Sequence, residues 1–308
     1  MASPTKITRP VIRVGGYAPP ESVHSGALDH FADYVDRESN GEVDVAIRYN
    51  VLDGGGKATD LFDLLESGEL TWMYYSSSYL GSKVPALNAL EIPFLFGSLS
   101  DAHAALDGPF GGELADHVRK LAGYDVLGFW DNGFRHLTNR VRPIEHPRDA
   151  AGMRIRLQPN HIHEALARAW GMEPVAAELS AGIAMIKAGE VDAQENPLGN
   201  TFAYGVSHEH ITLSAHLYGA RGLFANSHEM AGLAPDVRSL VETGAREAIN
   251  FQRSAAVEYE RELRARFESE GRAVFEPDEA ARAAFSDAAN DVIERARAEI
   301  DPQLLELL

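Results

Sequence analysis

Cysteine is absent from the 308 residues, so a disulfide framework, a thiolate nucleophile and a cysteine-based zinc site are all excluded. Basic residues are scarce as well: 28 lysines and arginines stand against 46 acidic residues, which gives a formal net charge of −18. Such a charge repels nucleic-acid phosphates and anionic membrane surfaces. The composition therefore argues against a nucleic-acid partner.

Long apolar runs are also missing. No run approaches the roughly 18 apolar residues that a membrane-spanning helix needs. The opening sequence, MASPTKITRP, lacks the apolar stretch of a secretion signal. Direct membrane insertion is not expected, and the chain is either cytoplasmic or exported with a signal that has since been removed.

Strand and helix patterns alternate along the first two thirds of the chain. Period-two alternation over 43–49 and a similar run at 11–14 predict strands, and the apolar positions of 23–35 share one helical face between them. Ser22 is a candidate cap for this helix. Further strands are predicted at 71–75, 124–130, 134–138, 153–157 and 174–177, and helices at 59–67, 101–106, 113–121, 161–170, 180–188 and 198–206. Alternation of this kind predicts an α/β fold with an open, helix-flanked sheet.

Chain length favours two lobes over one, because single hydrophobic cores stop growing near ~250–300 residues. After Pro235 a helical stripe of apolar residues continues to Gly271. Roughly 35 residues make about 50 Å of helix, which exceeds the width of a small lobe. This segment is predicted to run across both lobes.

Motifs for catalysis and metal binding are not found. The stretch GGGKATD at 54–60 fails as a phosphate loop, because that motif needs a glycine where Val51 stands and a hydroxyl residue where Ala58 stands. The histidine pairs at 161 and 163 and at 208 and 210 lack an acidic triad at ligand spacing, so we interpret them as exposed histidines near helix ends. No metal and no cofactor are predicted, although residues distant in sequence could still assemble a catalytic site.

Two stretches in the middle of the chain carry recognisable motifs. They read GFRHLTNRVRPIEHPRDAAGMRIRLQPN at 133–160 and GMEPVAAELSAGIAMIKAGEVDAQENPL at 171–198. Both resemble substrate-binding proteins of TRAP (tripartite ATP-independent periplasmic) transporters, with an arginine strand, a "G.kiR" strand and a "G.vDgqeNP" motif. Ala193 departs from the glycine that is usual there. The resemblance extends over nearly the whole chain through two further segments, EIPFLFGSLSDAHAALDG and LAPDVRSLVETGAREA.

The resemblance implies a two-lobe, periplasmic-binding-protein-like α/β clamp with helix-flanked mixed sheets and a long, lobe-spanning C-terminal helix at about 235–270. Lobe I is expected at 10–132 with a return segment at about 218–256. Lobe II is expected at 133–217 and is completed by about 257–308.

The implied function is transport by secondary uptake. A periplasmic solute-binding protein of this kind holds a small organic acid between its lobes and delivers it to membrane-embedded permease subunits without turnover. Two alternatives stay open: an enzyme, such as a lyase or hydrolase, that acts on a small organic acid in the same cleft, and a receptor of the ATP-driven uptake class.

The resemblance also assigns ligand-binding residues. Arg156 matches the arginine of the "kiR" strand, which forks onto the ligand carboxylate in the family. Arg135 matches an upstream arginine that joins it, Asn196 matches the asparagine of the "NP" turn, and His216 matches a strand-end position that lines the cleft. A guanidinium suits the first role physically, because its planar fork meets both carboxylate oxygens.

Departures from the family pattern bear on the ligand. Leu179 stands where sugar-acid members often carry a phenylalanine, so stacking from that side is lost. Tyr75, Ser76 and Tyr79 stand where small and polar residues are frequent, and Tyr17 follows the first strand. Aromatic bulk in the first lobe favours a smaller or partly aromatic acid over a long sugar acid.

Overall fold

The computed structural model describes residues 9–308; residues 1–8, which include most of the opening sequence MASPTKITRP that was expected to lack a secretion signal, lie outside the described part. The chain forms two compact units. Unit 1 comprises the described residues of Met1–Tyr75 together with Gly123–Gly128 and Gly222–Ser254, and unit 2 comprises Ser76–Ala122, Phe129–Arg221 and Ala255–Leu308. Segment Ser76–Ala122, which the sequence assigns to lobe I, thus packs within unit 2. The lobe boundaries themselves stay a prediction.

Unit 1 opens with the predicted β-α-β arrangement. Its strands are β1 (Val11–Gly15), β2 (Asp44–Arg48) and β3 (Trp72–Ser76), and its helices are α1 (Val23–Glu38), α2 (Asp60–Glu66), α8 (Ser227–Gly232) and the first part of α9. Strand β1 lies between β2 and β3 and is parallel to both. The side chain of Ser22 accepts a hydrogen bond from the backbone N–H of Ser25 at 3.1 Å, as its position before α1 predicts.

The core of unit 1 is built from the apolar face of α1. Ala27, Leu28, Phe31 and Val35 are buried, and the ring of Phe31 meets that of Trp72 edge-on at a centroid distance of 4.9 Å. Helix α9 packs against the same ring: a Cβ added at Gly244 would lie 3.1 Å from Phe31.

Unit 2 contains a mixed sheet. Its strands are β5 (Arg154–Leu157), β6 (Glu173–Ala176), β7 (Ala193–Asn196), β9 (Ala273–Phe275) and the larger parts of β4 (Tyr124–Asn139) and β8 (His210–Asn226). The strand order is β8-β4-β7-β5-β6, and β9 pairs with β8. Strand β7 is antiparallel to β4 and parallel to β5. The prediction of separate strands at 124–130 and 134–138 is wrong, because β4 continues through Gly133, which adopts a φ of 99°.

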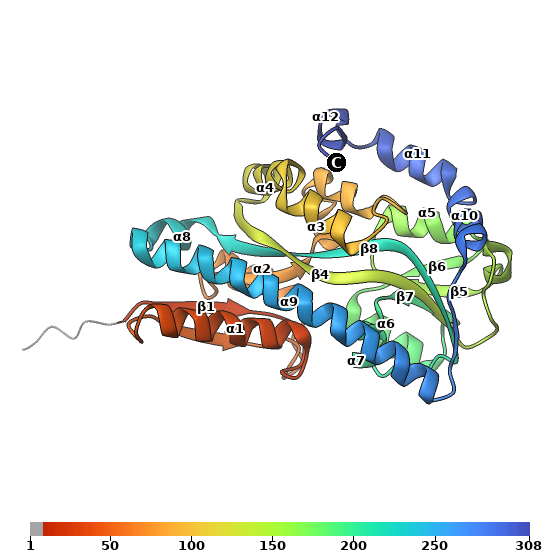
Figure 1. Ribbon diagram of the computed structural model, residues 1–308, viewed down its shortest axis with the longest axis horizontal. Helices are drawn as coiled ribbons and strands as arrows, with labels where there is room; N and C mark the ends of the chain where they lie inside the picture. The colour runs from red at the N-terminus through yellow and green to blue at the C-terminus, as the bar shows by residue number, and fades with distance from the viewer. Residues whose placement is uncertain (1–8) are drawn as a thin grey trace, which may run out of the picture. The chain divides into compact units, whose positions relative to one another are not determined.

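Helices flank the unit 2 sheet (Figure 1). They are α3 (Leu99–Asp107), α4 (Pro109–Ala122), α5 (His161–Ala169), α6 (Leu179–Ala188), α7 (Leu198–Ala203), α10 (Glu279–Asp287), α11 (Asn290–Ala298), α12 (Pro302–Leu305) and the short 3₁₀ helices η1 (Ser77–Leu80), η2 (Pro85–Glu91) and η3 (Pro147–Ala150). The long helix α9 (Pro235–Ser269) has 35 residues and belongs to both units, which confirms the predicted long helix. Its second part buries Leu263 and Phe267 against Ile211 and Leu213 of β8.

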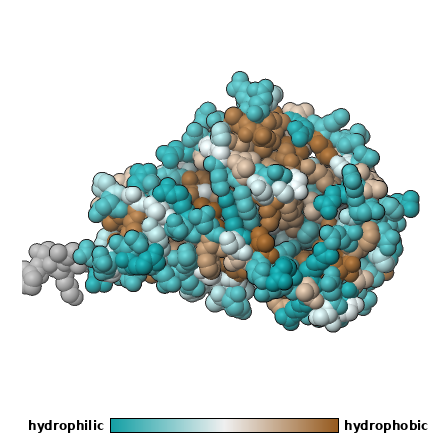
Figure 2. Space-filling model, in the orientation of Figure 1, coloured by the Kyte–Doolittle hydropathy of each residue, from teal (hydrophilic) through white to brown (hydrophobic). Residues whose placement is uncertain are grey.

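Hydrophilic residues cover most of the face shown in Figure 2, as the excess of acidic residues leads one to expect. None of the helices in the described part of the chain combines the length and the apolar character that crossing a membrane requires.

Candidate functional site

The two faces of the unit 2 sheet carry different polar residues. Residues paired across neighbouring strands point to the same face, and successive residues of one strand alternate between faces. Arg156 of β5 pairs with Gln194 of β7, two positions before Asn196. Arg156 and Asn196 therefore share one face. Glu195, which lies between Gln194 and Asn196, points to the other.

Arg156 is a buried cation without a counter-charge. The residue is only 3% exposed, and Nη2 donates a hydrogen bond to the carbonyl oxygen of Ala177 at 2.7 Å. Its Nε has no hydrogen-bond partner among residues 9–308, and no carboxylate there lies within ion-pair distance of the guanidinium. Glycine at position 182 of α6 makes room for this side chain, because a Cβ there would lie 2.1 Å from Nε.

Arg135 differs from Arg156 because a buried carboxylate already neutralises it. Its Nε pairs with Oε2 of Glu195, and its Nη2 donates to Oε1 of Glu195 at 2.7 Å. The same Nη2 lies 2.8 Å from the carbonyl oxygen of Glu195 and 3.2 Å from Oδ1 of Asn196. This two-pronged contact fixes the direction of the guanidinium. Burial lowers the pKa of Arg135, but Glu195 outweighs burial and raises it.

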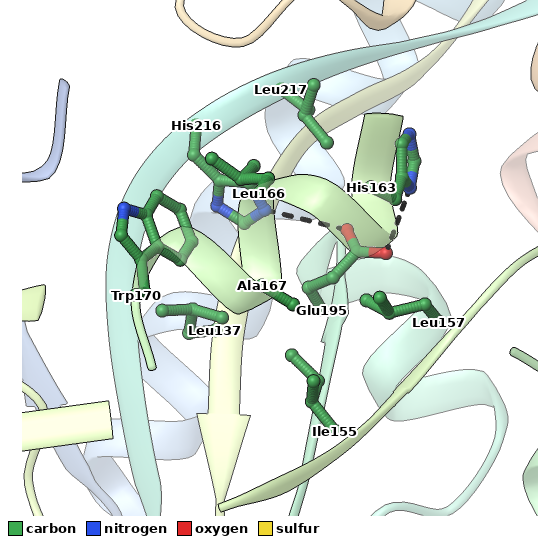
Figure 3. A pocket seen from close by; sticks show the side chains of 10 residues that line it. All are labelled: Leu137, Ile155, Leu157, His163, Leu166, Ala167, Trp170, Glu195, His216 and Leu217. Carbon is green, nitrogen blue, oxygen red and sulfur yellow. Dashed lines mark ion pairs between the residues drawn. The ribbon is translucent and has the colours of Figure 1, made fainter. Parts of the chain in front are cut away.

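Two histidines flank Glu195 beside a small, largely apolar pocket (Figure 3). Nδ1 of His163 lies 3.6 Å from Oε1 of Glu195, and Nε2 of His216 lies 3.6 Å from Oε2. Nε2 of His163 donates a hydrogen bond to Oε2 of Glu91 at 2.6 Å. Trp170 closes the pocket edge-on to His216, with ring centroids 5.2 Å apart. Four ionisable groups are thus brought together away from water, and they come from helix α5, strands β7 and β8, and η2.

The pKa shifts in this cluster separate the two histidines. Burial lowers the pKa of His163, but Glu195 and Glu91 outweigh burial and raise it to about 9. Burial dominates at His216 and lowers its pKa to about 4. Burial raises the pKa of Glu195, but Arg135 and the two nearby histidines hold it well below its ordinary value. The shifts thus favour the charged form of His163, the neutral form of His216 and the ionised form of Glu195.

A family model describes most of this chain: the model for bacterial extracellular solute-binding proteins, family 7, matches residues 14–299. The chain belongs to this family. The match confirms the resemblance to TRAP-type binding proteins that the motifs of the middle third indicate.

Relatives of this family 7 protein include a solute-binding protein of Verminephrobacter eiseniae, 32% identical over 201 residues. That alignment covers 64% of this chain but only 59% of the relative. Among solved structures, the sugar acid binding protein of Advenella mimigardefordensis in complex with galactonate is 26% identical, with a TM-score of 0.90 over 98% of this chain and 97% of that one. A TRAP periplasmic solute-binding protein of Sulfurospirillum deleyianum with bound succinate is also 26% identical, with a TM-score of 0.88 over 97% and 98%. These structures confirm the predicted fold class.

The remaining predicted residues of the family 7 protein lie in two groups. In unit 1, the ring of Tyr17 lies 5.0 Å from that of Tyr75. In unit 2, the hydroxyls of Ser76 and Ser78 lie 2.9 Å apart, Tyr79 contributes to raising the pKa of Arg135, and Leu179 is buried at the start of α6. Whether these residues touch a ligand stays a prediction.

Two sequence interpretations need correction. His216 does not end a strand: it lies in the middle of β8, because the strand continues through Ala215, whose φ is +44°. The histidine pairs are not all exposed, since His163 and His208 are buried and only His161 stands in solvent, beside Glu299. His208 is held inside by Thr138 Oγ1 at 3.0 Å from its Nδ1, and burial lowers its pKa to about 4.

Sequence reasoning missed Glu195, Glu91 and the role of His163. Glu195 stands in the "G.vDgqeNP" motif, but the resemblance assigns a ligand-binding role only to the asparagine beside it. A signal existed: β7 reads AQEN, three polar residues in a strand that is buried throughout. Buried polar side chains need partners, so such a strand indicates a hydrogen-bond network. The residues that the structure describes contain no group of three or more histidines and carboxylates arranged to hold a metal ion.

Proposed function

We propose that this chain is the extracytoplasmic solute-binding protein of a TRAP transporter, with Arg156 as the anchor for the carboxylate of a small organic acid. The observation that carries the proposal is the buried guanidinium of Arg156, which lacks a counter-charge among residues 9–308. Burying an unpaired charge is costly, so such an arrangement is maintained where a ligand supplies the missing partner.

The other residues take supporting roles in this proposal. The amide of Asn196 shares the sheet face of Arg156 and adds a hydrogen bond to the ligand. Arg135 is held in place by Glu195 and takes part in binding the ligand anion, and Tyr79 contributes to raising its pKa. Tyr17, Tyr75, Ser76, Leu179 and His216 complete the ligand-binding set. Solved relatives hold galactonate and succinate, which are both carboxylates. The ligand proposed here is a smaller or partly aromatic acid of the same chemical class.

The proposal includes binding without turnover. A general base needs a free carboxylate or imidazole near the reacting carbon. Glu195 is tied to Arg135 and faces away from Arg156, and His163 is tied to Glu91. The two ring nitrogens of His216 lie against Ser214 and Glu195. These contacts favour a receptor over the alternative of a lyase or hydrolase. Export to the periplasm, with a removed signal, and delivery of the ligand to membrane-embedded permease subunits belong to the same proposal.

A ligand panel tests the proposal. Purified protein is mixed with galactonate, succinate, smaller hydroxy acids and aromatic acids, and each mixture is followed by NMR. We expect at least one acid to show line broadening or shifts that saturate, while its spectrum stays chemically unchanged over hours. Conversion of an acid at catalytic protein concentration, or the absence of any response, contradicts the proposal.

A further inference from the structure

In the buried cluster that contains Glu195, the two carboxylates outnumber the one permanent cation. Glu91 and Glu195 are each 2% exposed, and Arg135 is the guanidinium that pairs with Glu195. His216 adds no positive charge at neutral pH, because burial lowers its pKa. Without a further cation, the cluster would hold a net charge of −1 inside the protein. That net negative charge would repel an anionic ligand from the guanidinium of Arg135.

His163 has the geometry of the missing cation. One ring nitrogen, Nε2, lies 2.6 Å from Oε2 of Glu91, and the other, Nδ1, lies 3.6 Å from Oε1 of Glu195. A neutral imidazole carries one proton and would turn a lone pair toward one of these carboxylates, whereas an imidazolium offers an N–H to each. The side chain is fully buried, so water cannot replace either contact.

Helix α5 itself does not favour a positive charge on His163. It lies in the first turn of α5, where the helix dipole disfavours a cation, so the two carboxylates must overcome the dipole. On the same helix, His161 pairs with Glu299 in solvent and Glu164 pairs with Arg168. Within residues 9–308, the ionisable groups that face His163 are thus Glu91 from η2 and Glu195 from β7. Glu195 in turn contacts Arg135 from β4 and His216 from β8, and the charges of Tyr79 and His136 act on those two groups. Figure 3 shows His163, Glu195 and His216 of this arrangement.

We infer that His163 is a positioning residue: as a buried imidazolium between Glu91 and Glu195, it keeps the cluster electrically neutral and leaves Arg135 able to face an anionic ligand. The inference rests on the proposed function for its effect on ligand affinity. It assigns a task to Glu91 as well, since the second carboxylate is what holds the proton on His163.

Charge-changing variants separate this task from simple packing. His163→Gln removes the imidazolium and gives the cluster a net charge of −1, so the affinity for galactonate or succinate, whichever binds, is expected to fall on the order of tenfold. Adding Glu91→Gln in the same chain restores neutrality and should recover most of that loss. A packing role predicts no recovery. His161→Gln is the matched control, because it makes the same substitution on the same helix at a solvent-exposed ion pair.

The pH dependence of ligand affinity, measured by calorimetry, gives a second test. Since the pKa of His163 is raised to about 9, wild-type affinity should decline as the pH rises through that value, while the affinity of His163→Gln should stay flat there. An NMR titration of the imidazole in ligand-free protein decides its charge independently. If no acid binds to the wild type, the proposed function fails, and the NMR titration of His163 then tests the inferred charge by itself. A neutral His163 at neutral pH, unchanged affinity in His163→Gln, or no recovery in the double variant overturns it.

Discussion

Replacing Arg156 by lysine is expected to weaken organic-acid binding by roughly 30- to 1,000-fold, although the charge is kept. The guanidinium fork meets both carboxylate oxygens, whereas a lysine ammonium is a single compact point. One oxygen of a desolvated carboxylate would then lack its charge-assisted hydrogen bond, at a cost of about 2–4 kcal/mol. Calorimetry with the acid that binds the wild type best measures the effect.

The control for this variant is Arg154→Lys, which makes the same substitution on the same strand at a solvent-exposed position. Its affinity should equal that of the wild type. A second variant, Arg156→Met, is expected to bind no acid and yet to be at least as stable as the wild type without ligand, because it removes an unpaired buried charge. Affinity within about threefold of wild type in Arg156→Lys would mean that another residue anchors the ligand.

Glu195→Gln is expected to lower the free energy of unfolding by about 3–5 kcal/mol at neutral pH. The substitution leaves Arg135 and His163 buried with one carboxylate fewer, and removing one partner of a buried pair costs more than the pair itself contributes. Urea denaturation measures the change. The exposed helical pair of Arg238 and Glu242 supplies the control, since Glu242→Gln should change stability by less than about 0.5 kcal/mol.

The acid side of the stability profile provides the check on Glu195. Its pKa is held well below the ordinary value of 4.5 in the folded protein, so its contribution is present above that value and is lost as the pH falls through the folded pKa. The difference between wild type and Glu195→Gln should therefore shrink on acidification. A difference that stays constant, or that is small at neutral pH, would contradict the network described here.

Elements with a regular hydrophobic period could be predicted from the sequence. The stripe after Pro235 marks α9 almost to the residue, and the apolar face of 23–35 marks α1. The division of strand β4 into two strands is wrong because a glycine in its middle resembles a break, although a strand can pass through such a residue at positive φ. Local sequence patterns therefore locate helices and strands better than they show whether two strand segments are continuous.

The candidate site could be predicted only in part. Motif resemblance selected Arg156, Arg135 and Asn196, but it gave no indication that Glu195 already neutralises Arg135. The burial of His163 depends on Glu91, which stands 72 positions away in the chain. No local periodicity in the sequence indicates a contact at that separation, so the sequence alone favours an exposed histidine near the helix end. The lack of a partner for Arg156 likewise requires coordinates, because it is a property of everything around that side chain.

The most direct measurement compares an organic acid with its own primary amide by calorimetry. The two ligands have nearly the same shape, but the amide lacks the negative charge that a buried, unpaired guanidinium requires. The acid is expected to bind, and its amide is expected to bind at least roughly 30-fold more weakly, the equivalent of about 2 kcal/mol. Equal affinity for the acid and the amide would contradict the central claim that Arg156 holds a carboxylate.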